Sequence, residues 1–130
     1  MIQSLCMTKI AIIEDDPVIS QMYRMKFEAE GFSVQLANNG SRGVSLVKDF
    51  KPDMILLDLE MPEMNGETAL KQIRSHDWGK HIPVMILTNL GAEEAPKSLK
   101  ALGIIDYIVK ANLTPSEVLS KVKEELKKLI

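Results

Sequence analysis

The clearest buried strand in the 130-residue sequence is DMILLD, residues Asp53–Asp58. Its four central residues are apolar without interruption, which is typical of a strand covered on both faces in a parallel sheet. A turn-rich loop follows at residues 61–66, and a helical pattern begins at Glu67. A buried strand followed by an amphipathic helix is half of a βαβ unit, so this stretch predicts an α/β fold.

The same alternation of strand and helix extends in both directions from this stretch. Three further apolar runs predict buried strands, and they are Ile10–Ile13, Pro83–Thr88 and Ile104–Val109. Residues 33–37 alternate between polar and apolar, as an edge strand exposed on one side does. Strand and helix repeated about five times imply right-handed crossovers and a parallel sheet with helices on both faces.

Local signals mark the predicted helices. Asp16 can cap a helix that has Pro17 at its first position, and Val18, Met22, Met25 and Ala29 then recur at helical spacing. In the last helix, Thr114 and Glu117 form a capping box. A buried stripe is predicted there at four positions, Val118, Val122, Leu126 and Leu129.

Three glycine and proline residues qualify this pattern. Gly91 and Pro96 oppose a long helix between the fourth and fifth strands, so we expect a short one that starts near Pro96. Gly43 lies inside a predicted helix, where it costs about 1 kcal/mol relative to alanine. We interpret Gly43 as a sign that this helix packs closely on the sheet.

Length and composition favour one globular domain over the whole chain, with a core at about residues 8–129 and an N-terminal extension at residues 1–7. Hydrophobic residues make up 45%, and 16 basic against 18 acidic residues give a net charge of −2. This balance argues against direct nucleic-acid binding through a basic face. The single cysteine, Cys6, excludes an intrachain disulfide and fits a reducing compartment. With no secretory signal and no membrane-spanning run, we expect a cytoplasmic location and no membrane contact.

The ends of the predicted strands carry the residues with chemical potential. In an open parallel sheet, ligands bind outside the carboxyl ends of the strands. Four strands deliver acids, a hydroxyl or an amine to that edge, and these residues are Glu14, Asp15, Asp16, Asp58, Thr88 and Lys110.

So many acids at one edge are unfavourable unless a cation binds there. Two carboxylates about 4 Å apart repel by roughly 4 kcal/mol at an effective dielectric constant near 20. Mg²⁺ would relieve this repulsion, and it usually takes one or two carboxylates together with a phosphate. Asp58 could then be a nucleophile that forms an acyl phosphate, with Lys110 and Thr88 contacting phosphoryl oxygens. Because Asp16 alone is explained as a helix cap, we rank it last among the metal ligands.

Taken together, these residues resemble the response-regulator receiver domains of two-component signalling. The resemblance extends from about Lys9 to Leu129 and rests on four segments in order, Ile12–Pro17, Ile55–Gly66, Ile86–Thr88 and Asp106–Lys110. It implies a flavodoxin-like (βα)5 fold, a three-layer sandwich with a parallel sheet in the order 2-1-3-4-5. It also implies that the chain catalyses only its own phosphorylation and dephosphorylation and is not an enzyme for other substrates.

The resemblance further implies roles for individual residues. Asp58 would accept a phosphoryl group from a sensor histidine kinase or a phosphotransfer protein. The Mg²⁺ cofactor would be held by Glu14, Asp15, Asp58 and the backbone carbonyl of Glu60, with Asp15 a direct ligand. Thr88 and Lys110 would contact the phosphoryl group.

The resemblance also implies an output. Movement of Thr88 would let Tyr107 turn inward, which would reshape the face made by the fourth helix, the fifth strand and the last helix. A downstream protein partner would bind this face. The sequence departs from the family at Asn89, where a small residue is usual, and at Ala111, where proline is usual.

Several hypotheses remain open at this point. The first is a stand-alone receiver that docks on a partner when phosphorylated, or that passes the phosphoryl group on as a phosphorelay intermediate. The second is an unphosphorylated interaction module with a receiver fold. A nucleotide-binding or phosphatase enzyme is disfavoured, because no glycine-rich phosphate loop follows the first strand and Asp58-Leu59-Glu60 lacks a second aspartate.

Overall fold

The computed structural model describes residues 8–129 and contains one five-stranded parallel sheet. Cys6 and the predicted N-terminal extension lie outside the described residues. The strands are β1 (Lys9–Ile13), β2 (Ser33–Ala37), β3 (Met54–Leu57), β4 (Val84–Thr88) and β5 (Asp106–Val109). Their order is β2-β1-β3-β4-β5, which confirms the predicted topology and the edge position of β2.

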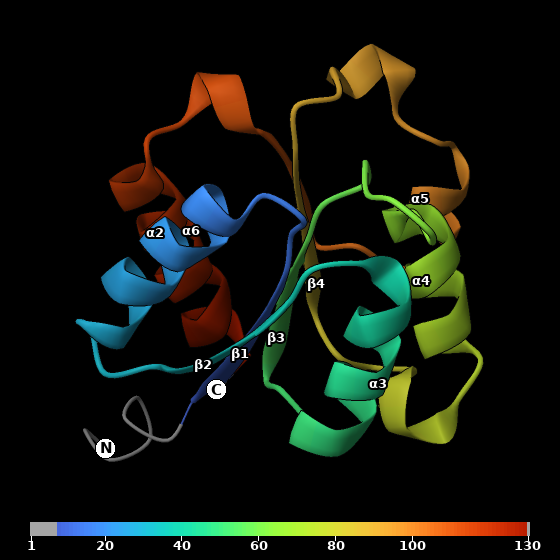
Figure 1. Cartoon of the computed structure of the whole chain (residues 1–130), viewed down its shortest axis with the longest axis horizontal. Coiled ribbons are helices and arrows are strands. Elements are labelled where there is room, and N and C mark those ends of the chain that lie inside the picture. The colour runs from blue at the N-terminus through green and yellow to red at the C-terminus, as the bar shows by residue number, and fades with distance from the viewer. Residues whose placement is uncertain (1–7, 130) are drawn as a thin grey trace.

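Helices cover both faces of the sheet (Figure 1). On one face lie α2 (Pro17–Glu28) and α6 (Pro115–Lys128). On the other lie α3 (Gly40–Phe50), α4 (Gly66–Arg74) and α5 (Ser98–Ala101). Three short 3₁₀ turns complete the described elements, η1 (Asp77–Gly79), η2 (Ala92–Glu94) and η3 (Lys110–Asn112). None of the helices in residues 8–129 has the length and apolar character needed to cross a bilayer.

The central strands divide their side chains between two hydrophobic cores. Ile12 and Leu56 point toward α2 and α6, whereas Ile13 and Leu57 belong to the core under α3 and α4. This alternation follows from the two-residue period of a strand. Because both faces are buried, the strand sequences are continuously apolar until they reach the sheet edge, where the charged residues begin.

The buried face of α2 differs from the predicted one. Tyr23 and Phe27 are buried, whereas Val18, Met22 and Met25 are 76%, 41% and 70% exposed. The helix carries two neighbouring apolar stripes, and the stripe with aromatic rings faces the sheet because it fills more volume. The Phe27 ring packs against Phe32 with its centroid 5.9 Å away.

The predicted stripe of α6 is wrong at its last position. Val118, Val122 and Leu126 are buried, but Leu129 is 56% exposed. The helix ends at Lys128, and Leu129 is its C-cap residue. The capping box at its start is present, with Glu117 and Thr114 bonded reciprocally.

Two glycines allow helices to approach the strands closely. A Cβ atom on Gly43 would lie 2.8 Å from the side chain of Ile13, which confirms the close packing expected there. A Cβ atom on Gly66 would lie 2.1 Å from the backbone oxygen of Asp58. The start of α4 therefore rests directly on the tip of β3.

Between β4 and β5 the chain forms the 3₁₀ turn η2 and one short α-helix, the four-residue α5, which confirms the short helix predicted there. Contacts from α4 hold this helix at both ends, and we call them the α4–α5 clamp. At one end, the Ser98 hydroxyl donates to the Glu67 carboxylate. At the other, Arg74 Nε donates to the carbonyl oxygen of Leu102 over 2.7 Å, and Arg74 Nη1 donates to the carbonyl oxygens of Gly79 and Ile82.

Candidate functional site

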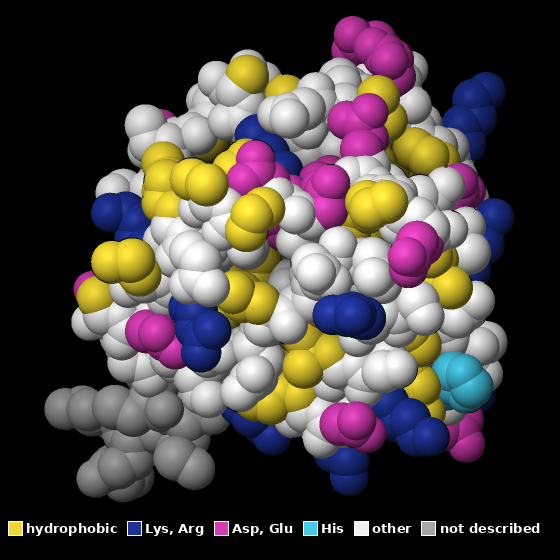
Figure 2. Space-filling view, in the orientation of Figure 1, with side chains coloured by type: hydrophobic (Ala, Val, Ile, Leu, Met, Phe, Trp, Pro, Cys, Tyr) yellow, Lys and Arg dark blue, Asp and Glu magenta, His cyan; other side chains and the backbone are white. Residues whose placement is uncertain are grey.

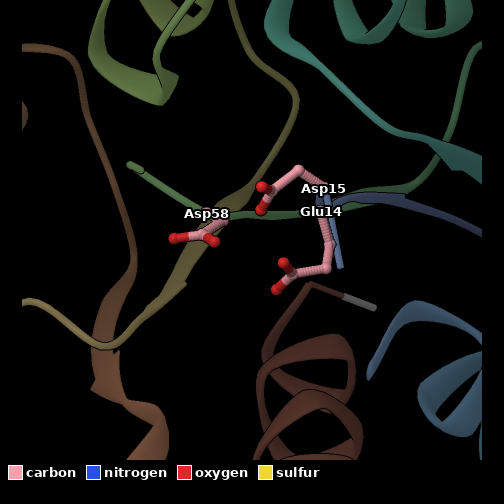
Figure 3. Close-up of side chains that lie close together, drawn as sticks. All are labelled: Glu14, Asp15 and Asp58. Carbon is pink, nitrogen blue, oxygen red and sulfur yellow. The ribbon is translucent and has the colours of Figure 1, made fainter. Parts of the chain in front are cut away.

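Three carboxylates meet at the carboxyl edge of the sheet. Glu14 and Asp15 directly follow β1, and Asp58 directly follows β3. Because Ile13 pairs with Leu57 in the parallel ladder, Glu14 and Asp58 leave adjacent strands side by side. One oxygen from each of the three carboxylates lies within 4.8 Å of the others, and Figure 3 shows the side chains grouped around one space. We call Glu14, Asp15 and Asp58 the acidic trio.

The members of the acidic trio differ in exposure. Glu14 and Asp58 are each 5% exposed, whereas Asp15 is exposed to solvent. The opening of the site is therefore on the side of Asp15, and a small ligand from solution would meet this residue first.

Lys110 brings the single ammonium group that contacts the acidic trio within the described residues. It follows β5, and its side chain is 10% exposed. Its Nζ donates to Glu14 Oε1 and to Asp58 Oδ2, the second contact being 3.2 Å long. Three carboxylates thus face one ammonium group, and the site carries an excess of negative charge.

Backbone amides also donate hydrogen bonds to the two buried carboxylates. The amide of Asp16 donates to Glu14 Oε2 over 3.0 Å, and the amide of Glu60 donates to Asp58 Oδ1 over 3.2 Å. Each buried carboxylate therefore has one oxygen bonded to the backbone and the other bonded to Lys110. Only the second partner is a side chain that can move.

The pKa directions follow from this arrangement. Burial raises the pKa of the Glu14 carboxyl, and the hydrogen bonds from Lys110 and from the Asp16 amide offset this effect only in part. Burial acts to lower the pKa of Lys110, but its hydrogen bond to Glu14 and the charge of Asp58 raise that pKa above its ordinary value. Burying carboxylates that one ammonium group does not fully neutralise is unfavourable, and this favours binding of a further cation at the site.

The remaining predicted site residues lie nearby with different partners. Asp16 is a helix cap, since its Oδ1 accepts hydrogen bonds from the amides of Val18 and Ile19, and it is not a member of the acidic trio. The Glu60 side chain is exposed, while its amide contacts Asp58.

Thr88 and Tyr107 contact the same residue. Thr88, fully buried at the end of β4, accepts a hydrogen bond from the Leu90 amide over 3.3 Å. The half-buried Tyr107 donates from its hydroxyl to the Leu90 carbonyl over 2.9 Å. The two predicted switch residues are therefore connected through the loop that follows β4.

The donor set of the acidic trio fits a hard divalent cation. Mg²⁺ binds oxygen at 2.0–2.1 Å in octahedral geometry, so ligands on opposite sides lie about 4.2 Å apart. Small movements would bring the three oxygens from their present separation of within 4.8 Å to that geometry. All three donors are carboxylates, which Mg²⁺ prefers to nitrogen or sulfur ligands.

The sequence analysis missed Tyr23 as a neighbour of this site. Tyr23 lines a narrow void together with Glu14 and Asp58. In the sequence it was one aromatic residue in an apolar helical pattern, and no local signal distinguished it from a core residue.

A comparison with protein families matches residues 10–123 to the response regulator receiver domain. The chain belongs to this family. The match includes every member of the acidic trio as well as Thr88, Tyr107 and Lys110. As a receiver domain, the chain accepts a phosphoryl group in two-component signalling.

Individual relatives agree with this assignment. The chain is 35% identical over 102 residues to the regulatory protein AtoC of Escherichia coli, covering 78% of this chain and 22% of that protein. It is 34% identical over 122 residues to the DNA-binding transcriptional regulator RpaA of Synechocystis, covering 94% of this chain and 50% of that protein. The receiver domain thus spans half or less of the length of these two relatives.

Solved structures of receiver domains have the same fold. The chemotaxis protein CheY4 of Vibrio cholerae superposes with a TM-score of 0.83 at 26% identity, covering 91% of this chain and 98% of that chain. The receiver domain of the Francisella response regulator 1452 superposes with a TM-score of 0.82 at 29% identity, covering 95% of this chain and all of that chain.

Proposed function

We propose that Asp58 accepts the phosphoryl group, from a sensor histidine kinase or a phosphotransfer protein, in a Mg²⁺-dependent reaction. The observation that carries this proposal is the position of Asp58, which is buried at the sheet edge beside two further carboxylates and the ammonium group of Lys110. Glu14, Asp15, Asp58 and the carbonyl of Glu60 would hold the metal ion. When bound, Mg²⁺ supplies positive charge that offsets the repulsion between Asp58 and the incoming phosphoryl oxygens.

The chain's own residues account for the transfer step. A carboxylate oxygen of Asp58 attacks phosphorus and forms an acyl phosphate, while the bond from phosphorus to the donor's imidazole nitrogen breaks and its electron pair stays on that nitrogen. Lys110 turns from the carboxylates to a phosphoryl oxygen, and the Thr88 hydroxyl donates to another. The backbone amide of Glu60 keeps Asp58 oriented during the reaction.

The same step would drive the output switch. When the Thr88 hydroxyl turns to the phosphoryl group, the Leu90 amide loses its acceptor and the loop after β4 is released. Tyr107, which donates to the carbonyl of Leu90, then changes its position. We propose that this alters the face made by α5, β5 and α6, where a downstream protein binds. An open groove beside Tyr107 on this face is lined by Ala95, Leu99 and Ile104.

The phosphodonor needs a docking surface next to Asp58, and the exposed stripe of α2 provides one. Val18, Met22 and Met25, with Pro115 of α6, line an open groove of about 760 Å³. The groove begins at Pro17, two residues after Asp15 of the acidic trio. Figure 2 shows hydrophobic side chains over α2 beside acidic side chains. An apolar surface that borders the site would bind the donor protein while its phosphorylated histidine reaches Asp58.

The remaining assignments rest on composition and on the family. We propose that residues 8–129 form the core of one receiver domain, which acts in the cytoplasm through protein contacts and not as an enzyme for external substrates. The near-neutral charge supports protein partners over direct nucleic-acid binding.

The test uses a small phosphodonor, acetyl phosphate, with Mg²⁺ and intact-mass spectrometry. The wild type should gain the mass of one phosphoryl group, and Asp58→Asn should gain none. Asp53→Asn is the matched control, because Asp53 flanks the opposite end of β3 and its carboxylate accepts from the Lys9 amide. It should be labelled like the wild type. A wild type that gains no mass, or an Asp58→Asn protein that is labelled equally, contradicts the proposal.

A further inference from the structure

The start of α3 and the loop after β3 are in direct backbone contact, although they belong to different βα units of the chain. The amide of Gly40, the first residue of α3, donates to the carbonyl oxygen of Met64 over 3.1 Å. Gly40 is buried, and a Cβ atom on it would lie 2.8 Å from the carbonyl carbon of Met64 and closer still to the oxygen. The contact therefore depends on the absence of a side chain at position 40.

The loop that Gly40 contacts, residues 60–65, includes Glu60, whose backbone carbonyl would ligate Mg²⁺ under the proposed function. The amide of Gly66 donates to the Leu59 carbonyl over 3.0 Å and closes the base of this loop. Within the described part of the chain, the bond from Gly40 is the only hydrogen bond that joins the loop to a segment distant in sequence. It is therefore the main external support of the loop.

The conformation of this loop requires such a support. Glu63 has a φ of 66°, in the left-handed region that is unfavourable for a residue with a side chain. The Glu63 side chain is exposed and has no hydrogen-bond or ion-pair partner in residues 8–129 that would stabilise this conformation. The bond from Gly40 to the next residue, Met64, holds the strained turn in place.

The helix that supports the loop is itself anchored to the strand that carries two of the acidic ligands. Asn39 caps the first turn of α3 through its side-chain oxygen. One turn further, Gly43 rests on the side chain of Ile13, the last residue of β1, and Glu14 and Asp15 follow directly. α3 thus fixes the loop after β3 relative to the end of β1.

This fixation matters because the proposed metal ligands come from both segments. Pairing of β1 with β3 sets the relative position of Glu14 and Asp58, but the ladder does not extend to Glu60. Mg²⁺ demands near-ideal octahedral geometry, so a ligand that is displaced binds it poorly. Contact with α3 supplies the positional reference that the sheet does not give to Glu60.

We propose that Gly40 is a positioning residue for the metal site, whose amide and missing side chain hold the loop after β3 where the Glu60 carbonyl ligates Mg²⁺. This inference rests on the proposed function. Gly40 touches neither the metal ion nor the phosphoryl group, and it acts through Met64 and the loop.

The test compares Gly40→Ala with Gly79→Ala, a control in which the new side chain meets backbone in the same way. A Cβ atom on Gly79 would lie 2.9 Å from the carbonyl carbon of Ile73 and closer still to its oxygen, between the end of α4 and the start of β4. Both variants should melt at a lower temperature than the wild type. Only Gly40→Ala should bind Mg²⁺ about tenfold more weakly by calorimetry, as expected when the support of a metal ligand is lost.

The Mg²⁺ dependence of labelling by acetyl phosphate gives a second readout. The Mg²⁺ concentration that gives half the maximal rate should rise about tenfold in Gly40→Ala. The maximal rate should stay within about twofold of the wild type, because the reacting carboxylate of Asp58 is unchanged. Gly79→Ala should match the wild type in both quantities once it is folded.

Hydrogen exchange of the wild type tests the inference without any variant, and so decides it even if Gly40→Ala does not fold. The Gly40 amide should be protected in Mg²⁺-free buffer, because it is bonded to Met64 before the metal binds. A contact that supports Mg²⁺ binding must be strengthened by it, so Mg²⁺ should slow exchange at Gly40 further. The reference is the Gly79 amide, which donates to the His76 carbonyl and should be slowed less.

The outcomes distinguish this inference from the proposed function. A wild type that binds Mg²⁺, together with a Gly40→Ala protein that binds it equally tightly, overturns the role of Gly40 and leaves Asp58 as phosphoacceptor. The same follows if Mg²⁺ slows exchange at Gly40 no more than at Gly79. A Gly79→Ala protein that loses as much Mg²⁺ affinity as Gly40→Ala assigns the loss to general destabilisation and also overturns the inference. A wild type that binds no Mg²⁺ overturns the proposed function and the role of Gly40 with it.

Discussion

The proposed phosphorylation site and the α4–α5 clamp each contain a partly buried cation, but the partners of these cations differ. Lys110 contacts two carboxylates, Glu14 and Asp58. Arg74 contacts neutral backbone carbonyls, among them those of Leu102 and Gly79. Burial lowers the pKa of Arg74, whereas at Lys110 the carboxylates outweigh burial and raise the pKa.

This difference separates a structural cation from one that can change partners. The carbonyls around Arg74 belong to the backbone of two separate stretches, residues 79–82 and 102–103, so the guanidinium cannot leave without releasing both. The partners of Lys110 are side chains at a site with excess negative charge, and a phosphoryl group would compete for its ammonium. The first arrangement holds α5 in place, and the second is suited to a reaction.

The largest expected effect is the loss of transfer in Lys110→Met. Without the ammonium group, charge on the transferring phosphoryl is less well stabilised, and the labelling rate with acetyl phosphate should fall by about 1000-fold. The variant should also be destabilised in Mg²⁺-free buffer and recover part of its stability with Mg²⁺, because the metal replaces the missing positive charge. Intact-mass time courses and urea unfolding measure the two effects. Equal labelling of Lys110→Met and the wild type would remove Lys110 from the reaction.

The second effect is on stability and comes from Arg74→Met. Its loss leaves partly buried carbonyls without donors, which should lower the free energy of unfolding by about 3 kcal/mol. Urea denaturation measures this change, and Mg²⁺ should not reduce the loss. Labelling of the folded variant should match the wild type. If Mg²⁺ rescued Arg74→Met as it rescues Lys110→Met, the two cations would not differ in the way described here.

The third effect concerns the surface that borders the site. Met25→Glu places a charge on the exposed stripe of α2, and it should slow transfer from a histidine-phosphorylated protein donor about tenfold, the effect of about 1.4 kcal/mol. Labelling by acetyl phosphate should not change. The control is Ile105→Glu, since Ile105 is also exposed but lies near Arg74 on the clamp side. If both variants slowed transfer equally, the docking surface would not be α2.

Sequence reasoning succeeded where the signal is local. Continuous apolar strands with charged residues at their ends predicted the sheet and the positions of Glu14, Asp58 and Lys110. The α2 helix was different, because two apolar stripes of similar hydrophobicity compete and only tertiary packing selects the stripe with Tyr23 and Phe27.

Neither the α4–α5 clamp nor the position of Tyr23 beside the acidic trio could be predicted from the sequence. Arg74 binds backbone carbonyls up to 29 positions away in the sequence, and carbonyls carry no sequence signal. The void shared by Tyr23 and Asp58 depends on how α2 packs across the sheet, which no periodicity encodes.

The smallest expected effect is a pH dependence of stability that arises from the contact between Ser98 and Glu67, at the other end of the α4–α5 clamp from Arg74. The hydrogen bond from Ser98 lowers the pKa of Glu67 below its ordinary value, with a further contribution from Lys71. Such a group stabilises the fold above its unfolded pKa and loses this contribution as the pH falls through the folded pKa. Ser98→Ala should raise the pKa of Glu67 toward its ordinary value of 4.5, as measured by NMR titration. The free energy of unfolding of the variant should then fall less steeply than that of the wild type as the pH decreases. An unchanged pKa would mean that Ser98 does not bond to Glu67 in solution.

The most direct test of a metal-assisted phosphorylation site is a Mg²⁺ titration of the melting temperature of the unphosphorylated protein. Binding to the folded state alone should add about 2.7 kcal/mol of stability at a concentration one hundred times the dissociation constant. The melting temperatures of the wild type and of Asp53→Asn should rise with the Mg²⁺ concentration. Those of Asp15→Asn and Asp58→Asn should rise far less. A wild type whose melting temperature ignores Mg²⁺, or an Asp15→Asn protein that responds equally, would contradict the assignment of the acidic trio.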